Sequence, residues 1–592
     1  MKTAKPSTAL LTIAAGAAVS VAAAAPLHFV DVTSSRVVQT VAEVGNNEKS
    51  VELGDFDNDG DLDAVIGVAL SDFGAKRNKL YRNDNGVMQE VTGTAIPSFV
   101  STQRVTRVAF LKDYDEDGWA DIYVINDANS NTDQLFLNQH PGGVFQSFTE
   151  VTGHLPNGGL LGAACSGVSV DLNNDGHIDV FSANYPNSPQ DKLIFGDGAG
   201  FFTDVTNTHM ISDSSYDIEA DAADFNNDGQ LDLIITNDGS ATNYILWNNN
   251  QNAGSGPGDF RYTGSTSNFA GGTGENAMEP GDFDGDGLID FYWGNFSGNV
   301  DRVFKNMGIG SNGKATFQQL TSLNLPPSVS QHTVRKIVPG DLNADGRVDA
   351  IVMKESAGDN RPSVLRNTTV NGVISFVDWT EASAFPSGNS LEGWHGAIFD
   401  SNSDGDQDFF LGAFVGDHLF ENELAPTFDA SSLVGGVVPG VFDGSSAVVN
   451  RAKGDPTSFV IENVNAGGFV SAIVTGASDL TLDVLDAGGN VIGSSNRGGA
   501  GVEEALQVNN LSAGSITVRV SGENQADVNA DTVVNGADLA ILLIAFGTDG
   551  AVTGTDFNND GIVDGADLAT LLINWGTAGV GNFTLELLAR SS

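Results

Sequence analysis

Oxygen-bearing side chains recur in this chain at a spacing that suits a metal ion. Seven nonapeptides follow the pattern Asp-x-Asp/Asn-x-Asp-Gly-x-x-Asp, and we number them loops one to seven. Positions 1, 3, 5 and 9, together with a backbone carbonyl at position 7, offer the shell of six or more oxygen ligands that Ca²⁺ prefers. Gly at position 6 in every copy lets the chain turn back with a positive φ. The pattern therefore predicts hard-cation sites.

The predicted metal ligands are the side chains at positions 1, 3, 5 and 9 of each loop. They are Asp55, Asp57, Asp59 and Asp63; Asp113, Asp115, Asp117 and Asp121; Asp171, Asn173, Asp175 and Asp179; Asp224, Asn226, Asp228 and Asp232; Asp282, Asp284, Asp286 and Asp290; Asp341, Asn343, Asp345 and Asp349; Asp400, Asn402, Asp404 and Asp408. One copy alone could be an acidic surface turn, since Asp, Asn and Gly favour turns. Seven copies that share Asp at positions 1, 5 and 9 favour metal binding.

Strands are expected to position these loops. An EF-hand loop needs an acidic residue at position 12 and a helix after it. Position 12 is apolar in six of the copies and Ser182 in loop three, and β-branched or aromatic residues follow position 9. Each loop is therefore predicted to lead into a strand.

The loops begin 53 to 59 residues apart, which is typical of an array of one structural unit. Each unit contains four strand-like pieces, of which the third reads roughly Asn/Asp-x-Leu-aromatic-x-Asn. Four short antiparallel strands per unit predict a propeller blade. An extra strand of the fourth type, Phe29 to Thr33, precedes loop one, and the seventh unit lacks a clear one. We predict a mainly β fold with a seven-bladed β-propeller that this strand closes. An open solenoid would fit the period but not the offset.

These loops and their flanking strands resemble FG-GAP/VCBS repeats, the units of integrin-α-type propellers and of many secreted bacterial proteins. The resemblance covers residues 28–424. It implies Ca²⁺ at seven propeller sites, held in the hairpin between the first two strands of each blade. Adhesins, lectins and polysaccharide lyases share this fold, so the fold alone does not assign a function.

The C-terminal part has a different pattern. Residues 427–525 alternate as strands without a metal nonapeptide and predict a β-sandwich. DLTLDVLDAGGNVIGSS and SITVRVSG resemble the bacterial pre-peptidase C-terminal domain, whose final strand would lie in residues 580–592. This resemblance implies a secreted accessory module.

Residues 526–579 carry two loops of another calcium pattern, which begin 29 residues apart and precede apolar, helix-compatible runs. The pair resembles a dockerin-like EF-hand module inserted between the last two strands of the sandwich, with up to two further Ca²⁺ sites. The ligands would be Asp527, Asn529, Asp531, Asn535 and Asp538, then Asp556, Asn558, Asp560, Asp564 and Asp567. Thr532 replaces Gly at position 6 of the first copy, which predicts a weaker site or a different loop geometry. Small residues at positions 10 and 11 depart from the dockerin pattern, so the module could bind a protein partner or pack within the chain.

Composition limits the classes of partner. The formal net charge of −49 and pI near 4.1 argue against a nucleic-acid partner. Residues 1–25 carry Lys2 and Lys5, an apolar run and Ala23–Ala25, which predict a secretory signal peptide rather than a membrane anchor. No later apolar stretch has the length of a transmembrane segment. The expected signal peptide predicts an exported protein. With Cys165 as the single cysteine no intrachain disulfide can form, so we expect Ca²⁺ to stabilise the fold instead.

Three functions remain open. The loops opposite the metal sites carry amides and Tyr185, Trp293, Phe296 and Trp394, which would suit a polysaccharide or cell-surface glycan, although such residues also form ordinary turns and cores. A secreted, non-catalytic binding protein is the leading hypothesis. A polysaccharide lyase or glycoside hydrolase would need an acid and a base in the channel, from residues such as Arg107, Glu219, Glu275, His332 or His395. The third hypothesis is a structural surface-layer or matrix protein.

Overall fold

The computed structural model describes the chain from Phe29 to Arg590 with gaps. The gaps are 41–46, 70–76, 102–103, 128–131, 160–163, 185–189, 212–216, 238–242, 249–256, 262–274, 296–300, 321–324, 327–331, 356–360, 370–371, 381–390, 415, 423–426, 430–432, 434–436, 439–442, 452–457, 465–468, 477–478, 496–503, 509–510, 524–535, 547–561, 564–567, 569–570 and 572–582. The expected signal peptide and every predicted dockerin-like ligand except Asp538 lie outside the described residues.

The fold is mainly β, as predicted. Residues 29–422 contain seven separate sheets in the described part of the chain, one for each nonapeptide loop. The first four sheets are β3 (Asn47–Gly54), β4 (Asp63–Ala69), β5 (Lys79–Asn83) and β6 (Met88–Glu90) with β2 (Val37–Val38) at the edge; β7 (Thr106–Lys112), β8 (Asp121–Asn126), β9 (Gln134–Gln139) and β10 (Ser147–Glu150); β11 (Ala164–Val170), β12 (Asp179–Asn184), β13 (Lys192–Gly196) and β14 (Phe202–Asp204); and β15 (Asp217–Ala223), β16 (Asp232–Asn237) and β17 (Tyr244–Leu246).

The remaining three sheets repeat this order. They are β18 (Glu275–Gly281), β19 (Asp290–Asn295), β20 (Arg302–Ile309) and β21 (Ala315–Gln319); β22 (Thr333–Gly340), β23 (Asp349–Glu355), β24 (Ser363–Asn367) and β25 (Phe376–Asp378); and β26 (Gly393–Phe399), β27 (Asp408–Ala413) and β28 (His418–Asn422) with β1 (Phe29–Asp31). In all seven, the nonapeptide joins the first strand to the second, which begins at the Asp of position 9. The prediction that each loop leads into a strand is therefore confirmed.

The seventh sheet takes its outer strand from the beginning of the described chain. β1 pairs antiparallel with β28, with Phe29 opposite Asn422 and Asp31 opposite Phe420. The chain then passes through α1 (Thr33–Arg36) into β2, which pairs with β6 of the first sheet. This is the pairing expected for the strand Phe29 to Thr33, and it ties the first sheet to the seventh.

The seven sheets contact one another in cyclic order, and we call this arrangement of contacts the ring. Their first strands β3, β7, β11, β15, β18, β22 and β26 touch in sequence, and β26 touches β3 again. Seven apolar clusters fill the spaces between neighbouring sheets. The cluster between the seventh and first sheets brings Phe399 and Phe410 against Ile66 and Tyr81. Burial of apolar surface between sheets therefore holds this part of the chain together.

Short helices lie in the segments that connect the strands. They are α2 (Thr92–Ala95), α3 (Pro97–Ser101), the 3-10 turn η1 (Pro156–Gly158) and α4 (Thr206–His209). None of the helices in the described part of the chain has the length and apolar character to cross a membrane.

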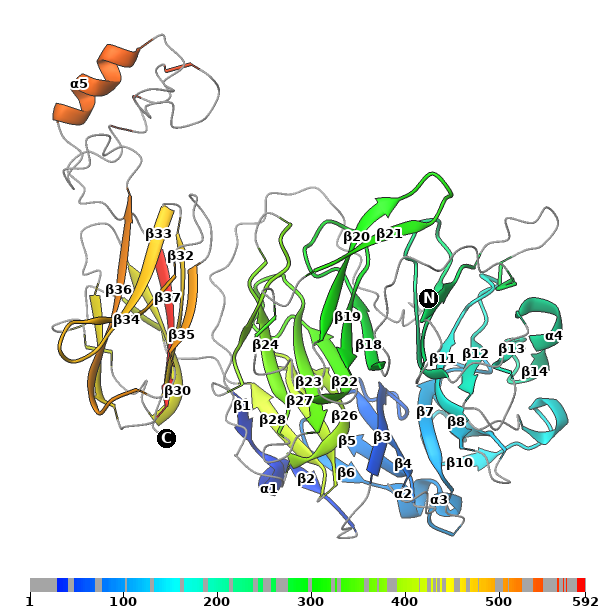
Figure 1. Cartoon of the computed structure of the whole chain (residues 1–592). Coiled ribbons are helices and arrows are strands. Elements are labelled where there is room, and N and C mark those ends of the chain that lie inside the picture. The colour runs from blue at the N-terminus through cyan, green and yellow to red at the C-terminus, as the bar shows by residue number, and fades with distance from the viewer. Residues whose placement is uncertain are drawn as a thin grey trace.

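Two further sheets follow residue 426 and lie beside the seven (Figure 1). One contains β29 (Thr427–Asp429), β30 (Asp443–Arg451), β37 (Phe583–Arg590), β32 (Phe469–Gly476) and β35 (Glu504–Val508); the other contains β31 (Ser458–Val464), β36 (Gly514–Glu523), β33 (Asp479–Leu485) and β34 (Val491–Ser495). A shared apolar cluster that includes Phe459, Val484 and Leu585 lies between them. The helix α5 (Gly536–Ala545) falls in the segment between β36 and β37.

Candidate metal centres

Each nonapeptide is shaped by hydrogen bonds from its own backbone to its acidic side chains. In loop one, Asp55 accepts the N–H groups of Asp59 and Gly60 at 3.2 and 3.1 Å. Asp59 accepts the N–H of Asp61 at 3.0 Å. The same three contacts occur in all seven loops. The carboxylates at positions 1 and 5 thus fix the turn that brings the ligand set together.

Two positions in each loop adopt left-handed backbone conformations. The predicted positive φ at position 6 is confirmed, from 82° at Gly346 to 102° at Gly60. Position 4 also has a positive φ in every loop, including 55° at Ala344 and 57° at Glu116. Non-glycine residues pay a conformational cost there. The nonapeptide therefore keeps the same turn even where a non-glycine residue at position 4 strains the backbone.

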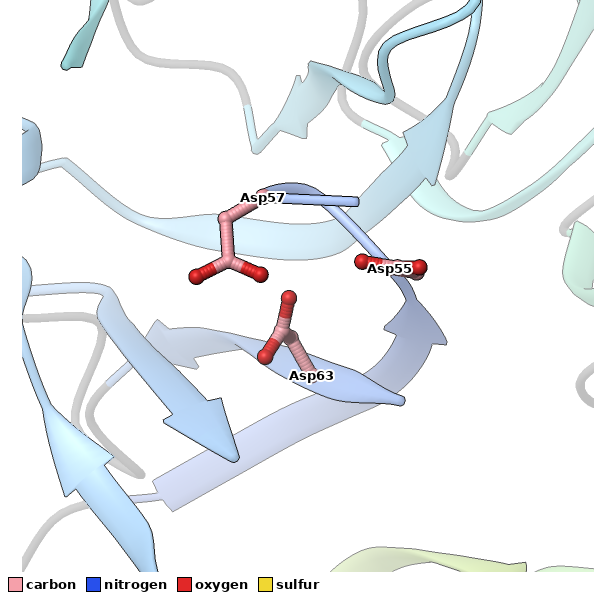
Figure 2. A group of neighbouring side chains, drawn as sticks. All are labelled: Asp55, Asp57 and Asp63. Carbon is pink, nitrogen blue, oxygen red and sulfur yellow. The ribbon is translucent and has the colours of Figure 1, made fainter. Parts of the chain in front are cut away.

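The acidic side chains converge in the loops that have Asp at position 3. Three carboxylates have ligand atoms within 4.8 Å of one another in loops one (Asp55, Asp57, Asp63), two (Asp113, Asp115, Asp121) and five (Asp282, Asp284, Asp290). Figure 2 shows the loop-one carboxylates pointing toward a common space. Three carboxylates around one point fit a hard divalent cation.

Loops three, four, six and seven carry Asn at position 3. In loop three, the Asn173 amide oxygen accepts the N–H of Asp175 at 2.8 Å, and its amide nitrogen donates to the Asp175 carboxylate at 2.9 Å. Asn226, Asn343 and Asn402 make the same pair of contacts. The amide thus takes the place of a carboxylate and lowers the charge of the ligand set by one.

Position 9 has a second role that the sequence pattern did not reveal. In loop one, Asp63 is fully buried and accepts the N–H of Phe56 at 2.9 Å and that of Asn83 at 2.8 Å. Its equivalents accept the N–H of the corresponding residue on the third strand in every sheet. The last ligand of each loop therefore also anchors the third strand of its own sheet.

The asparagine on that third strand reaches the neighbouring sheet, and we call it the latch asparagine. Asn138 of the second sheet donates from Nδ2 to the carbonyl of Phe56 in loop one at 2.8 Å. Asn248, Asn306, Asn367 and Asn422 bind position 2 of the preceding loop in the same way. Asn83 of the first sheet donates to the carbonyl of Ser401 in loop seven at 2.9 Å. The third sheet has Gly196 here, where a Cβ would lie 2.3 Å from the carbonyl oxygen of Ile178.

The recurring Asn of the third strand is visible in the sequence, but the sequence pattern predicts only a strand there and not a contact with another sheet. Its partner lies about 80 residues away in five of the six cases, since Asn248 and Leu172 are 76 residues apart and Asn306 and Phe225 are 81. No local periodicity connects such residues. The sheet-to-sheet bond follows from the ring arrangement.

Contacts between consecutive loops place them on one edge of the ring. Asn58 of loop one donates to the carbonyl of Gly118 in loop two at 3.0 Å, and Asn174 of loop three donates to that of Gly229 in loop four at 3.2 Å. The Glu116 carboxylate of loop two lies 2.7 Å from the His177 imidazole of loop three. Acidic loops in series concentrate negative charge along this edge.

Without a cation, burial and mutual repulsion raise the pKa values of these carboxyl groups. Burial is the main cause that raises the pKa of Asp63, Asp121 and Asp290 to about 8 each. Burial and then the neighbouring Asp59 raise the pKa of Asp57 to about 6. A divalent ion would reverse these shifts, because an adjacent positive charge favours the ionised form.

A second charged cluster lies on the first strands, where the catalytic hypothesis placed its acid and base. The Lys336 ammonium lies 2.8 Å from Glu219 and 2.9 Å from Glu279. The partly buried His395 accepts the N–H of Val51 at Nδ1, and desolvation lowers its pKa to about 3. Arg107 pairs with Asp127. Lys336, His395 and Arg107 are thus each engaged in an internal contact.

The aromatic and amide residues predicted for glycan contact have mixed placements. Trp293 is 1% exposed and packs against Phe291 and Phe304, so it belongs to the core. Trp394 is partly exposed, and the Arg335 guanidinium stacks 4.0 Å above its ring. Asn126 donates from Nδ2 to the Thr132 carbonyl and so holds its own loop. Tyr185 and Phe296 lie outside the described residues.

Comparison with known families agrees with the repeat pattern. The family model described as FG-GAP-like repeat matches residues 55–124, 171–235, 224–293 and 282–352. These matches begin at loops one, three, four and five and include six of the seven nonapeptides. A search of curated proteins returned no match. The chain therefore carries FG-GAP-like repeats, which are typical of extracellular proteins.

Proposed function

We propose that residues 28–424 form a seven-bladed β-propeller that binds Ca²⁺ in its nonapeptide loops, and that the protein acts outside the cell as a non-catalytic binding or adhesion protein. The observation that carries this proposal is the convergence of three carboxylates within 4.8 Å in loops one, two and five. FG-GAP-like repeats and the cyclic contacts between seven sheets support the same conclusion. The expected signal peptide at residues 1–25 would direct export.

Calcium would act here as a structural ion. The residues that would hold it are those at positions 1, 3, 5 and 9, and the bound ion would neutralise carboxylates that otherwise repel one another. Because the position-9 Asp also anchors the third strand, each ion would stabilise a whole sheet. Seven such ions would reduce the formal net charge of −49 by 14 units, which favours a compact ring.

The ligand-binding face is proposed to be the one opposite the metal loops. Each first strand has a register shift of one residue near its beginning, at the end away from its loop. The residues at these bulges are Lys49, Arg107, Cys165, Ile218, Asn276, Arg335 and Trp394. β-Bulges concentrate next to functional sites, where they redirect side chains. Arg107, Arg335 and the partly exposed Trp394 at these bulges would suit a polysaccharide or cell-surface glycan.

Two accessory modules complete the proposal. Residues 427–525 with 580–592 would form the pre-peptidase-like β-sandwich, and residues 526–579 the dockerin-like pair with up to two further ions. Leu543 and Ile544 of helix α5 and the following Phe546 are exposed, with Ile544 80% exposed. An exposed apolar surface of this kind supports a protein partner for the module.

The test has two parts. Equilibrium dialysis of the purified chain against calcium-45 should show several ions bound per chain, and a chain that binds none would contradict the metal assignment. A glycan array probed with and without calcium should then show calcium-dependent binding. Calcium binding without any glycan signal would favour a structural surface or matrix protein.

A further inference from the structure

One position on or just after the third strand of each sheet contacts the metal loop of that sheet in the first, fifth, sixth and seventh sheets, and we call it the facing position. It is the residue immediately before the latch asparagine, or before Gly196 in the third sheet. The residues are Arg82, Leu137, Phe195, Trp247, Lys305, Arg366 and Glu421. The side chains thus range from apolar to basic and acidic, whereas the loops they face are nearly alike.

In loop five the facing residue supplies a positive charge to the ligand set. The Lys305 ammonium donates to Oδ2 of Asp284 at position 3 and lies 3.3 Å from Oδ2 of Asp286 at position 5. It also donates to the carbonyl of Gly372 in the sixth sheet at 3.1 Å. The Lys305 side chain is 17% exposed and that of Asp284 is fully buried. The ammonium therefore neutralises carboxylates that an ion in loop five would need.

Loop six has a comparable arrangement with arginine. The buried Arg366 guanidinium lies 3.3 Å from Oδ2 of Asp345 at position 5, and Arg347 of the loop itself lies 2.6 Å from the same oxygen. The amide nitrogen of Asn343 donates to that oxygen as well, at 2.9 Å. Three donors thus occupy one ligand atom.

Loop two is the natural comparison for loop five. Both have Asp at positions 1, 3, 5 and 9, and in both the carboxylates at positions 1, 3 and 9 converge. The facing residue of loop two is Leu137, which carries no charge. The His140 imidazole lies 3.3 Å from Asp117 at position 5 of this loop, where loop five has the Lys305 ammonium. Loop one is intermediate, since Arg82 is 3.8 Å from Asp57 and 2.8 Å from Asp84.

We propose that Lys305 and Arg366 act as built-in cations that compete with Ca²⁺, so that loops five and six bind the ion more weakly than loop two does. This proposal rests on calcium binding by the nonapeptides. An incoming ion must displace the ammonium from Asp284 and Asp286, which costs charge-assisted hydrogen bonds. That cost corresponds to a loss of about ten- to a hundred-fold in affinity. The ring would therefore fill in two stages as calcium rises.

The experiment exchanges the facing residues of the two matched loops in the full chain. Lys305→Met removes the ammonium and keeps an unbranched side chain, while Leu137→Lys places one over loop two. Bound calcium is counted by equilibrium dialysis at pH 8 across a series of fixed free calcium concentrations. Lys305→Met should move about one ion per chain to the tight stage, and Leu137→Lys should move about one ion out of it.

The double variant Lys305→Met with Asp286→Asn locates the effect, because removal of a loop-five ligand should abolish the gained tight ion. Thermal melts give a second readout. Without calcium, Lys305→Met should lower the melting temperature, since the Asp284 and Asp286 carboxyl groups lose their internal cation. With saturating calcium, its melting temperature should recover relative to wild type. A wild-type chain that fills all its propeller loops in one stage, with both single variants unchanged, would overturn the competition. A wild-type chain without bound calcium would instead overturn the proposed function.

Discussion

Replacement of Asn83 by Ala removes the latch between the first and seventh sheets. Asn83 is fully buried and makes two side-chain hydrogen bonds. Its Nδ2 donates to the Ser401 carbonyl at 2.9 Å, and its Oδ1 accepts the N–H of Gly86 at 2.8 Å. Ala cannot make either bond, although its backbone N–H can still reach Asp63. The substitution therefore tests the side-chain latch separately from the anchor of the third strand.

The expected loss follows from the groups left behind. A buried polar group that loses its partner costs about 1–3 kcal/mol. The Ser401 carbonyl and the Gly86 N–H both lose a partner in a buried position, so we expect the free energy of unfolding to fall by about 2–4 kcal/mol. Part of the Gly86 term is recovered if water reaches the hairpin of residues 84–87. The cost of the unpaired Ser401 carbonyl remains, because loop seven approaches the first sheet at this residue.

Differential scanning calorimetry in saturating calcium measures this loss as a lower melting temperature. Asn85→Gly is the matched control, since Asn85 is an exposed asparagine of the same hairpin with a φ of 53° that glycine adopts freely. Hydrogen exchange should also quicken in β26 and β3, which meet at this junction. Equal melting temperatures for Asn83→Ala and Asn85→Gly would refute the latch as a stabilising contact between the two sheets.

Three further predictions concern the ion, the pH and the closing strand. Chelation of calcium should lower the melting temperature steeply, because each site held at a hundred-fold excess over its Kd contributes about 2.7 kcal/mol; calorimetry with and without chelator checks this, and an unchanged melt would contradict it. Without calcium, the free energy of unfolding should fall as pH rises from about 4 to about 8. The folded form retains protons on Asp63, Asp121 and Asp290, whose pKa values are raised to about 8, while the unfolded chain releases these protons near the ordinary pKa of Asp. Urea titrations at pH 5 and pH 8 should show this difference in stability without calcium and lose it with calcium. Phe29→Ala should lower the free energy of unfolding by about 3–5 kcal/mol, because this fully buried side chain of β1 packs among residues of the sixth and seventh sheets. Val38→Ala, at a side chain that is 45% exposed, is the control. Equal urea midpoints for the two variants would argue against closure by β1.

Local chemistry explains what could be predicted from the sequence. Gly60 and its equivalents need a positive φ, and the β-branched and aromatic residues after position 9 form the second strand of each sheet. The pairing of Phe29 with Asn422 was also foreseeable, because a surplus strand at one end matched a missing one at the other. These features depend on neighbours in the chain or on counting the repeats.

Other features depend on contacts that the repeat pattern does not encode. The left-handed φ at Ala344 could not be predicted from a residue that disfavours it. Trp293 was proposed as a glycan contact, but it lies in the core because its strand is covered by sheets on both sides. Lys305 gave no signal in the motif, since only the folded third strand brings it above loop five. Residues of this kind are placed by the ring, and their chemistry follows from that placement.

The double use of the position-9 Asp links ion binding to the cohesion of the ring. Asp290 is a predicted ligand of loop five, and it also accepts the N–H of Asn306 at 2.7 Å. The same Asn306 holds loop four through the carbonyl of Phe225 at 2.9 Å. An ion in loop five would keep Asp290 ionised and so strengthen the hydrogen bond that positions Asn306. Occupancy of one loop would therefore stabilise the preceding loop, and the proposed calcium sites would then fill with positive cooperativity along the ring wherever a latch asparagine is present. The absence of a latch at Gly196 predicts that this coupling is broken between loops three and two.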